Sequence, residues 1–168
     1  MTPPLLGRPG LESPDEPATQ TGRGAHIAIG RRGEAFAAAY LEQEGLRIVA
    51  ANFVVPVGRT RLGAVVNAEI DLVAYDGATL CFIEVKSRMS DWFAPPEANV
   101  DRRKQRQIAR AARVYRRMFD LQDAPYRYDV VTVILPAEPA QSPNVQLLQN
   151  YWQEDQLRKR VWSDRNWD

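Results

Sequence analysis

The chain has 168 residues, with 22 lysines and arginines against 21 aspartates and glutamates, so its net charge points to no particular partner. The length suffices for one domain with a real hydrophobic core, and the single cysteine, Cys81, excludes an internal disulfide framework. No apolar run approaches the roughly 20 residues of a membrane helix and the signal-peptide pattern is missing, so we expect a cytoplasmic protein with no membrane partner.

The first part of the chain is predicted to contain a tail, a helix and a strand. Residues 1–25 are rich in proline and glycine and poor in large apolar side chains, which predicts a disordered tail. His26, the only histidine, has no second ligand nearby and is predicted to be solvated. Residues 33–44 are predicted to form a helix that ends before a glycine, and residues 46–55 a strand. The segment 56–63 is predicted to be a turn-rich connection.

The second part is predicted to contain a hairpin, a long helix and further strands. Residues 69–75 and 80–88 form the predicted hairpin. Residues 99–119 carry an apolar stripe typical of an amphipathic helix. Residues 128–135 form a predicted buried strand, and residues 145–148 allow a short edge strand. The order is helix, three strands, helix, one or two strands, which predicts an α/β domain with a mixed central sheet flanked by helices.

The predicted hairpin places charged residues among apolar ones. It turns at the pair Asp76-Gly77, which favours a two-residue loop. With an even loop, Asp71 and Glu84 project to the same side, about 5–8 Å apart. Lys86 follows on the same strand face as Glu84, because side chains alternate along a strand. An odd loop without a bulge would instead separate the two carboxylates.

Two carboxylates held this close favour a cation between them. Magnesium takes oxygen ligands, commonly one or two protein carboxylates with water and substrate phosphate, and manganese is a substitute. Lys86 would then orient an attacking water or stabilise charge on a phosphate oxygen. Glu34, on the inward face of the first predicted helix, could add a carboxylate. The alternatives are a surface ion pair between Glu84 and Lys86, and a Glu34 that merely favours the helix dipole.

The long predicted helix is strongly basic over residues 102–117, with no acidic residue among its cations. A positive stripe of this kind can contact a phosphate backbone, so we predict nucleic-acid binding that weakens with salt. The alternative is a solvated outer face. The residues predicted to bind nucleic acid are Arg102, Arg103, Lys104, Arg106, Arg110 and Arg113.

Three further observations concern single side chains. Cys81 lies on the strand face opposite Glu84 and is predicted to be a buried apolar residue, not a nucleophile. The tryptophans near the C-terminus could stack on bases, cover the core or dock on a partner, and docking is favoured. These are Trp152, Trp162 and Trp167. Asp129, at the start of a buried strand, could support the site, cap a backbone group or pair with an arginine.

Several segments, taken together, resemble one protein family. They include "GRRGEAFAAAYLEQEGLRIVAANF" (30–53), "EIDLVAYDGATLCFIEVKSR" (69–88), "DRRKQRQIARAARVY" (101–115), "YRYDVVTVIL" (126–135) and "NVQLLQNYW" (144–152). In this order they resemble the YraN family of the restriction-endonuclease-like PD-(D/E)xK superfamily, which is related to Holliday-junction resolvases. Compared with that family, the chain carries Ala68 in place of a glycine and extra residues between Asn52 and Glu69.

The resemblance implies a restriction-endonuclease-like core and a set of site residues. Glu34, Asp71, Glu84 and Lys86 match the catalytic positions, and the backbone carbonyl of Val85 would join the three carboxylates as a metal ligand. The resemblance divides the chain into a tail (1–25), an endonuclease-like domain (26–152) and a C-terminal extension (153–168). Because resolvase-like relatives often act as dimers, it also allows a homodimer.

The leading hypothesis from the sequence is a magnesium- or manganese-dependent nuclease that hydrolyses phosphodiesters in structured or branched DNA. The alternative is a non-catalytic nucleic-acid-binding or adaptor module that keeps the nuclease fold. A third hypothesis is a protein-interaction scaffold that uses the aromatic C-terminal tail. Metal uptake separates the first from the second, and loss of partner binding on removal of residues 153–168 identifies the third.

Overall fold

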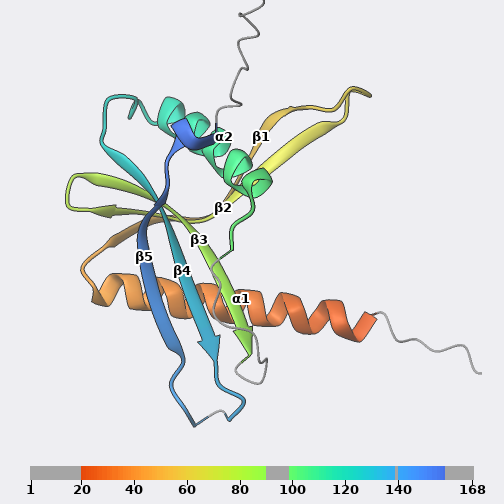
Figure 1. Ribbon diagram of the computed structural model, residues 1–168, viewed down its shortest axis with the longest axis vertical. Helices are drawn as coiled ribbons and strands as arrows, with labels where there is room; N and C mark the ends of the chain where they lie inside the picture. Colours follow the sequence, from red (N-terminus) through yellow and green to blue (C-terminus); the bar gives the residue numbers. More distant parts are fainter. Residues whose placement is uncertain (1–19, 90–98, 139, 158–168) are drawn as a thin grey trace, which may run out of the picture.

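The computed structural model describes residues 20–89, 99–138 and 140–157, and these form two helices, five strands and one short 3-10 helix (Figure 1). The order confirms the predicted α/β arrangement of helix, three strands, helix and strands. The elements are α1 (Gln20–Gln43), β1 (Arg47–Arg59), β2 (Val65–Asp76), β3 (Thr79–Met89), α2 (Arg102–Met118), β4 (Tyr126–Leu135), β5 (Asn144–Trp152) and the 3-10 helix η1 (Glu154–Leu157).

The five strands form one mixed sheet in the order β1-β2-β3-β4-β5. The first three strands are antiparallel to one another, β3 and β4 are parallel, and β5 returns antiparallel to β4. A parallel pair needs a crossover between its strands, and α2 supplies it between β3 and β4. Because that crossover runs over one face of the sheet, the other face is left for α1 (Figure 1).

Alternation along β3 divides the core into two clusters. Phe82 points to the α2 side, where it meets Ile108 and Tyr115, whereas its neighbour Ile83 points to the α1 side and packs with Leu41. Burying each such apolar side chain contributes about 1.5–3 kcal/mol. The strands therefore carry apolar residues on both faces, as expected for a sheet covered by helices on both sides.

The β2–β3 hairpin has the even loop that the predicted site requires. Asp76 pairs with Thr79, so Gly77 and Ala78 form the turn, and Gly77 has a φ of 56°. The prediction had the parity right but placed the turn one residue too early, at Asp76-Gly77. Moving the turn by one residue shifts the pairing of the two strands by two residues. Each side chain therefore still projects to the same side of the sheet as in the prediction.

Several predicted boundaries were wrong. Helix α1 begins at Gln20, not at residue 33, so its first turns lie within the predicted disordered tail; residues 1–19 lie outside the described part of the chain. Strand β1 continues through Pro56 to Arg59, where a turn-rich connection was predicted. Pro56 is tolerated because β1 is an edge strand and its register shifts between Pro56 and Gly58. Strand β5 is also longer than residues 145–148.

Candidate functional site

The candidate site lies where β2 and β3 part. The last regular pair between these strands is Leu72 with Ile83, which leaves Asp71 and Glu84 as the next residues across the gap. The Oδ2 atom of Asp71 accepts a hydrogen bond of 2.7 Å from the backbone N–H of Val85. The Asp71 carboxylate thus takes the place of a strand partner. Because the N–H and C=O of one strand residue point to the same side, the Val85 carbonyl also faces this gap.

Glu84 is a buried carboxylate held by two ammonium groups. The residue is only 3% exposed, and its Oε1 lies 3.0 Å from Nζ of Lys86. Its Oε2 lies 3.1 Å from Nζ of Lys104. That second contact lacks hydrogen-bond geometry, so Oε2 is a buried acceptor with an ion-pair partner but no hydrogen bond. A buried carboxylate oxygen in this state can accept a further cationic ligand.

The Asp71 carboxyl is destabilised in its charged form. Burial raises its pKa most, and the charge of Glu84 raises it further, to about 7. The Val85 N–H and Lys104 lower it, but by less. Burial also opposes the charge of Lys104, yet Glu84 and Asp71 outweigh that effect and raise the Lys104 pKa. The two carboxylates thus repel each other in a buried setting, with Lys86 and Lys104 as their cationic partners.

Glu34 lies at the margin of this cluster. Helix α1 comes very close to β3 at Gly33, where an added Cβ would lie 2.3 Å from the Cβ of Ser87. The next residue, Glu34, is half-buried, and its charge raises the Asp71 pKa, although it is the smallest of the causes. Within the described ranges, no three histidine, cysteine, aspartate or glutamate side chains are close enough together to form a metal-binding group. Asp71 and Glu84 thus interact more strongly with each other, and Glu34 acts on Asp71 through its charge from α1.

Lys104, one of the residues predicted to bind nucleic acid, forms an ion pair with Glu84. Its position follows from the start of α2, where Asp101 caps the helix by accepting a 2.8 Å hydrogen bond from the Lys104 N–H. In the first turn of α2, Lys104 is half-buried and faces the sheet, whereas Arg102 and Arg103 are exposed. No short sequence motif contains both Lys104 and Glu84, since the pair joins α2 to β3 across the fold.

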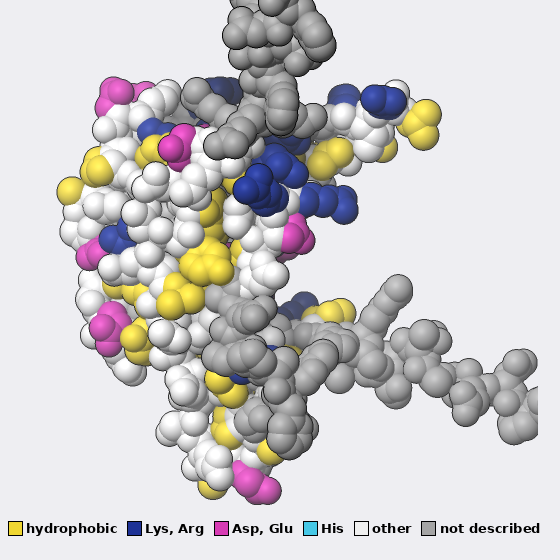
Figure 2. All heavy atoms as spheres, in the orientation of Figure 1, with side chains coloured by type: hydrophobic (Ala, Val, Ile, Leu, Met, Phe, Trp, Pro, Cys, Tyr) yellow, Lys and Arg dark blue, Asp and Glu magenta, His cyan; other side chains and the backbone are white. Residues whose placement is uncertain are grey.

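The basic face of α2 is divided into two parts. Arg102, Arg103, Arg106 and Arg110 are exposed, and Figure 2 shows lysine and arginine side chains gathered where α2 begins. Nearer the C-terminal end, Arg113 forms an ion pair with Glu154 of η1 at 2.8 Å. This acid lies far along the chain, so the absence of acids within the helix did not reveal it. The ion pair with Glu154 thus screens Arg113, whereas the exposed arginines at the start of α2 have no such acidic partner among the ion pairs of the described residues.

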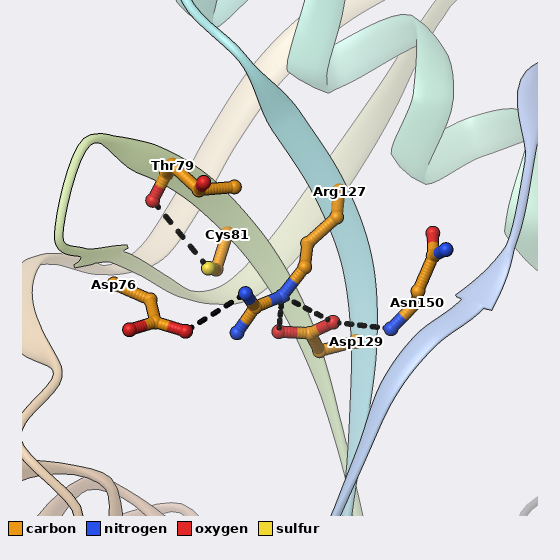
Figure 3. Close-up of polar contacts among 6 residues, drawn as sticks. All are labelled: Asp76, Thr79, Cys81, Arg127, Asp129 and Asn150. Carbon is orange, nitrogen blue, oxygen red and sulfur yellow. Dashed lines mark hydrogen bonds and ion pairs between the residues drawn. The ribbon is translucent and has the colours of Figure 1, made fainter.

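Asp129 belongs to a separate polar network on the other face of the sheet (Figure 3). It is fully buried and accepts two hydrogen bonds from Nε of Arg127, at 3.0 and 2.8 Å, and one of 2.7 Å from the N–H of Asn150. Arg127 also pairs with Asp76 at 2.8 Å. Of the three roles open to Asp129, two are observed: it pairs with an arginine and it caps the backbone N–H of Asn150. The network ties β2, β4 and β5 together.

Cys81 and Trp152 are structural residues. Cys81 is fully buried beside the Arg127 network, which confirms the predicted burial, and burial raises the pKa of its thiol to about 12 (Figure 3). Trp152 stacks on Tyr128, with ring centroids 5.0 Å apart and planes 12° apart. It covers the core, so docking on a partner was the wrong prediction for this residue. Trp162 and Trp167 lie outside the described residues.

Comparison with known proteins places the chain in a family. A model of the family described as "Uncharacterised protein family UPF0102" matches residues 33–133. The chain belongs to the UPF0102 family. A UPF0102 protein of Solibacter usitatus is 44% identical over 110 residues, which cover 66% of this chain and 77% of the relative. Another, from Koribacter versatilis, is 39% identical over 125 residues, covering 74% and 76%.

A third UPF0102 protein, from Chlorobium chlorochromatii, is 45% identical over 105 residues, covering 62% of this chain and 73% of the relative. UPF0102 is the YraN family, so the family resemblance seen in the sequence is confirmed. The match to the UPF0102 family includes Glu34, the whole β2–β3 hairpin and α2. In the part of the chain that the structure describes, no helix is long and apolar enough to cross a membrane.

Proposed function

We propose that this protein is a metal-dependent nuclease of the PD-(D/E)xK type that hydrolyses phosphodiesters in structured or branched DNA. The observation that carries the proposal is the convergence of Asp71, Glu84 and Lys86 at the gap between β2 and β3. The basic start of α2 beside this gap supports a polyanionic substrate. The superfamily resemblance of the hairpin points the same way.

The residues of the gap suit a magnesium or manganese ion. Asp71 and Glu84 repel each other, and Oε2 of Glu84 is a buried acceptor without a hydrogen bond. These two carboxylates and the Val85 carbonyl would hold the ion, which accords with the one or two protein carboxylates that magnesium usually takes. When bound, the ion would supply Lewis acidity and a water of lowered pKa. Glu34, whose charge also acts on Asp71, would contribute to this set directly or through water.

Lys86 and Lys104 would then have different roles in the reaction. Once its bond to Glu84 is released, the Lys86 ammonium would donate a hydrogen bond to the attacking water and orient it towards the phosphorus. Lys104, on the α2 side, would donate to a non-bridging phosphate oxygen and offset the charge that develops there. The exposed arginines at the start of α2 would hold neighbouring phosphates and fix the register of the strand.

A cleavage assay combined with calorimetry tests this proposal. Wild type, Asp71→Asn and Lys86→Gln are incubated with branched DNA and magnesium or manganese, and manganese uptake is measured without DNA. We expect both variants to lose about 100-fold or more in cleavage, because each removes a charge that stabilises the transition state. Asp71→Asn should also lose manganese binding, whereas Lys86→Gln should keep it.

Glu42→Gln is the matched control, since Glu42 is an exposed carboxylate at the far end of α1. It should cleave and bind manganese like the wild type. Equal cleavage by wild type, Asp71→Asn and Lys86→Gln would reject the nuclease assignment.

A second candidate is a non-catalytic DNA-binding module that keeps the same fold. The observation in its favour is that Lys86 and Lys104 already neutralise Glu84 from both sides. It predicts no manganese uptake by the wild type and salt-sensitive DNA binding that Asp71→Asn leaves unchanged. The calorimetric titration separates the two candidates before any cleavage is measured.

A further inference from the structure

The β1–β2 hairpin extends beyond the body of the protein as an arm (Figure 1). At its base, Val55 and Ala68 are buried in the cluster on the α2 side of the sheet. Beyond Val57, which still packs against that cluster, every residue from 58 to 65 is exposed. This outer part of the hairpin packs on no other element of the described structure, so its surface is accessible to a partner.

Hydrogen bonds fix the conformation of the arm's tip. The N–H of Thr60 donates to the carbonyl of Ala64 at 2.8 Å, and the N–H of Gly63 donates to the carbonyl of Thr60 at 3.0 Å. Nη1 of Arg59 donates to the carbonyl of Gly63 at 2.9 Å. Gly63 has a φ of 84°, which a residue with a side chain adopts only with strain. The tip is thus a defined turn, and Arg59 helps to build it.

The tip combines positive charge with an apolar side chain. Arg59 and Arg61 lie on the turn, and Leu62 at its apex is 97% exposed. No aspartate or glutamate occurs between residues 45 and 68. A single exposed leucine is ordinary on a protein surface, but this one directly follows Arg61 on a defined turn that Arg59 also helps to build. Proteins that kink DNA insert apolar side chains such as leucine between base pairs and place cations on the flanking phosphates.

The arm is continuous with the candidate active site. Strand β2 runs without interruption from Val65, beside the tip, to Asp71. At about 3.3 Å per residue this distance is about 20 Å, or about six base pairs of a duplex. Figure 2 shows lysine and arginine side chains at the tip of the arm and again where α2 begins, on the same side of a hollow. A DNA chain that passes the start of α2 would therefore reach the arm.

We propose that the β1–β2 arm is a DNA-contacting arm in which Arg61 holds a phosphate and Leu62 inserts at an opened base step of branched DNA, about half a helical turn from the cleaved bond. This inference rests on the proposed function and specifies its substrate, because a branch point offers base pairs that are already partly unstacked. Insertion there costs less than in a continuous duplex.

A second copy of the chain is the competing partner for the arm. Strand β1 is an edge strand, and edge strands can pair with each other. However, Pro56 removes one backbone donor from this edge, and register shifts occur between Ile48 and Ala50 and between Pro56 and Gly58. These features oppose the continuous pairing that a strand-to-strand dimer needs.

Binding measured in EDTA tests the arm separately from catalysis. The probes are a four-way junction and a linear duplex of equal length, read by fluorescence anisotropy, and a junction with 2-aminopurine at the branch. Leu62→Ser should weaken junction binding about tenfold and remove most of the 2-aminopurine fluorescence rise, with a smaller effect on the duplex. Arg61→Gln should make the plot of log binding constant against log salt concentration less steep, by about the amount that one phosphate contact contributes.

Matched controls lie at the other end of the same strand. Arg47→Gln and Val49→Ser make the same chemical changes at exposed positions of β1, and both should bind the junction like the wild type. If Leu62→Ser and Arg61→Gln also bind like the wild type, the arm proposal is overturned while the nuclease proposal stands. Failure of the nuclease proposal shows instead as absent manganese uptake, with these binding differences intact.

Analytical ultracentrifugation of the same variants distinguishes the competing partner. If the wild type is a dimer and Leu62→Ser is a monomer, the arm binds a second copy and the DNA-contacting role is rejected. If the mass of Leu62→Ser equals that of the wild type and its junction binding is weaker, the DNA-contacting role of the arm is supported.

Discussion

The buried position of the Asp71 carboxylate lowers the stability of the fold. Its carboxyl is buried beside Glu84, and its pKa rises from 3.8 to about 7. Above about pH 4 the unfolded chain releases this proton readily, whereas the folded chain keeps it until about pH 7. The free energy of unfolding therefore falls as the pH rises from 4 to 7, and the penalty is complete above pH 7. Carboxyl groups whose pKa is raised by burial and by a neighbouring charge are found more often at functional sites than elsewhere.

Replacing the carboxylate should remove this penalty. At pH 8 we expect Asp71→Asn to exceed the wild type in free energy of unfolding by about 1–3 kcal/mol, because an amide still accepts the Val85 hydrogen bond without charge. At pH 4.5 the difference should shrink. Urea unfolding at both pH values measures it, and Glu42→Gln, at an exposed position, should change stability by less than about 0.5 kcal/mol. An Asp71→Asn protein less stable than the wild type at pH 8 would contradict the explanation.

Magnesium binding should offset the destabilisation caused by the charged Asp71 carboxylate. At pH 8 millimolar magnesium should raise the melting temperature of the wild type, since binding to the folded state stabilises it, and should have little effect on Asp71→Asn.

Helix α1 is positioned by one close contact with the sheet. Gly33 lies against Ser87 of β3, whose hydroxyl also donates a 3.3 Å hydrogen bond to the carbonyl of Ile29. This contact sets the depth at which Glu34 approaches the gap between β2 and β3. Gly30, one turn earlier in the same helix, has no atom within 4 Å of the position that a Cβ would take. The two glycines thus serve as a natural pair for comparison.

Alanine at these two positions should have opposite effects. Gly33→Ala should lower the free energy of unfolding by about 1–3 kcal/mol, because its methyl group would overlap the Ser87 side chain close to the backbone. Gly30→Ala should raise it by about 0.5–1 kcal/mol, because alanine favours a helix more than glycine does. Chemical denaturation at pH 7 measures both, and a Gly33→Ala protein as stable as Gly30→Ala would show that α1 does not pack on β3 as described.

The molecule as a whole has two apolar clusters that share one sheet. Leu41 anchors the cluster under α1 and Ile108 the cluster under α2, and both side chains are fully buried. Neighbouring residues of β3 contribute to opposite clusters, so neither helix can detach without exposing one face of the same strands. This arrangement predicts a single cooperative unfolding unit.

Shortening a core side chain on either face of the sheet should therefore destabilise the whole domain in one unfolding transition. Leu41→Ala and Ile108→Ala should each lower the free energy of unfolding by about 2–5 kcal/mol without changing the denaturant slope. Hydrogen exchange should show faster opening of the most protected amides on both sides of the sheet in either variant. Met118→Ala, at an exposed position, is the control. Faster exchange confined to α1 in Leu41→Ala would indicate two separate units instead.

Local patterns in the sequence determined the order of the elements, the burial of Cys81 and the even loop of the β2–β3 hairpin. These follow from side-chain alternation and loop parity, which depend only on near neighbours in the chain. The tertiary structure decided that Lys104 contacts Glu84, that Glu154 screens Arg113 and that Trp152 covers Tyr128. It also decided how far β1 and β2 extend as an arm. Each of these depends on where one element crosses another, and local periodicity does not encode the depth and angle of packing across a twisted sheet.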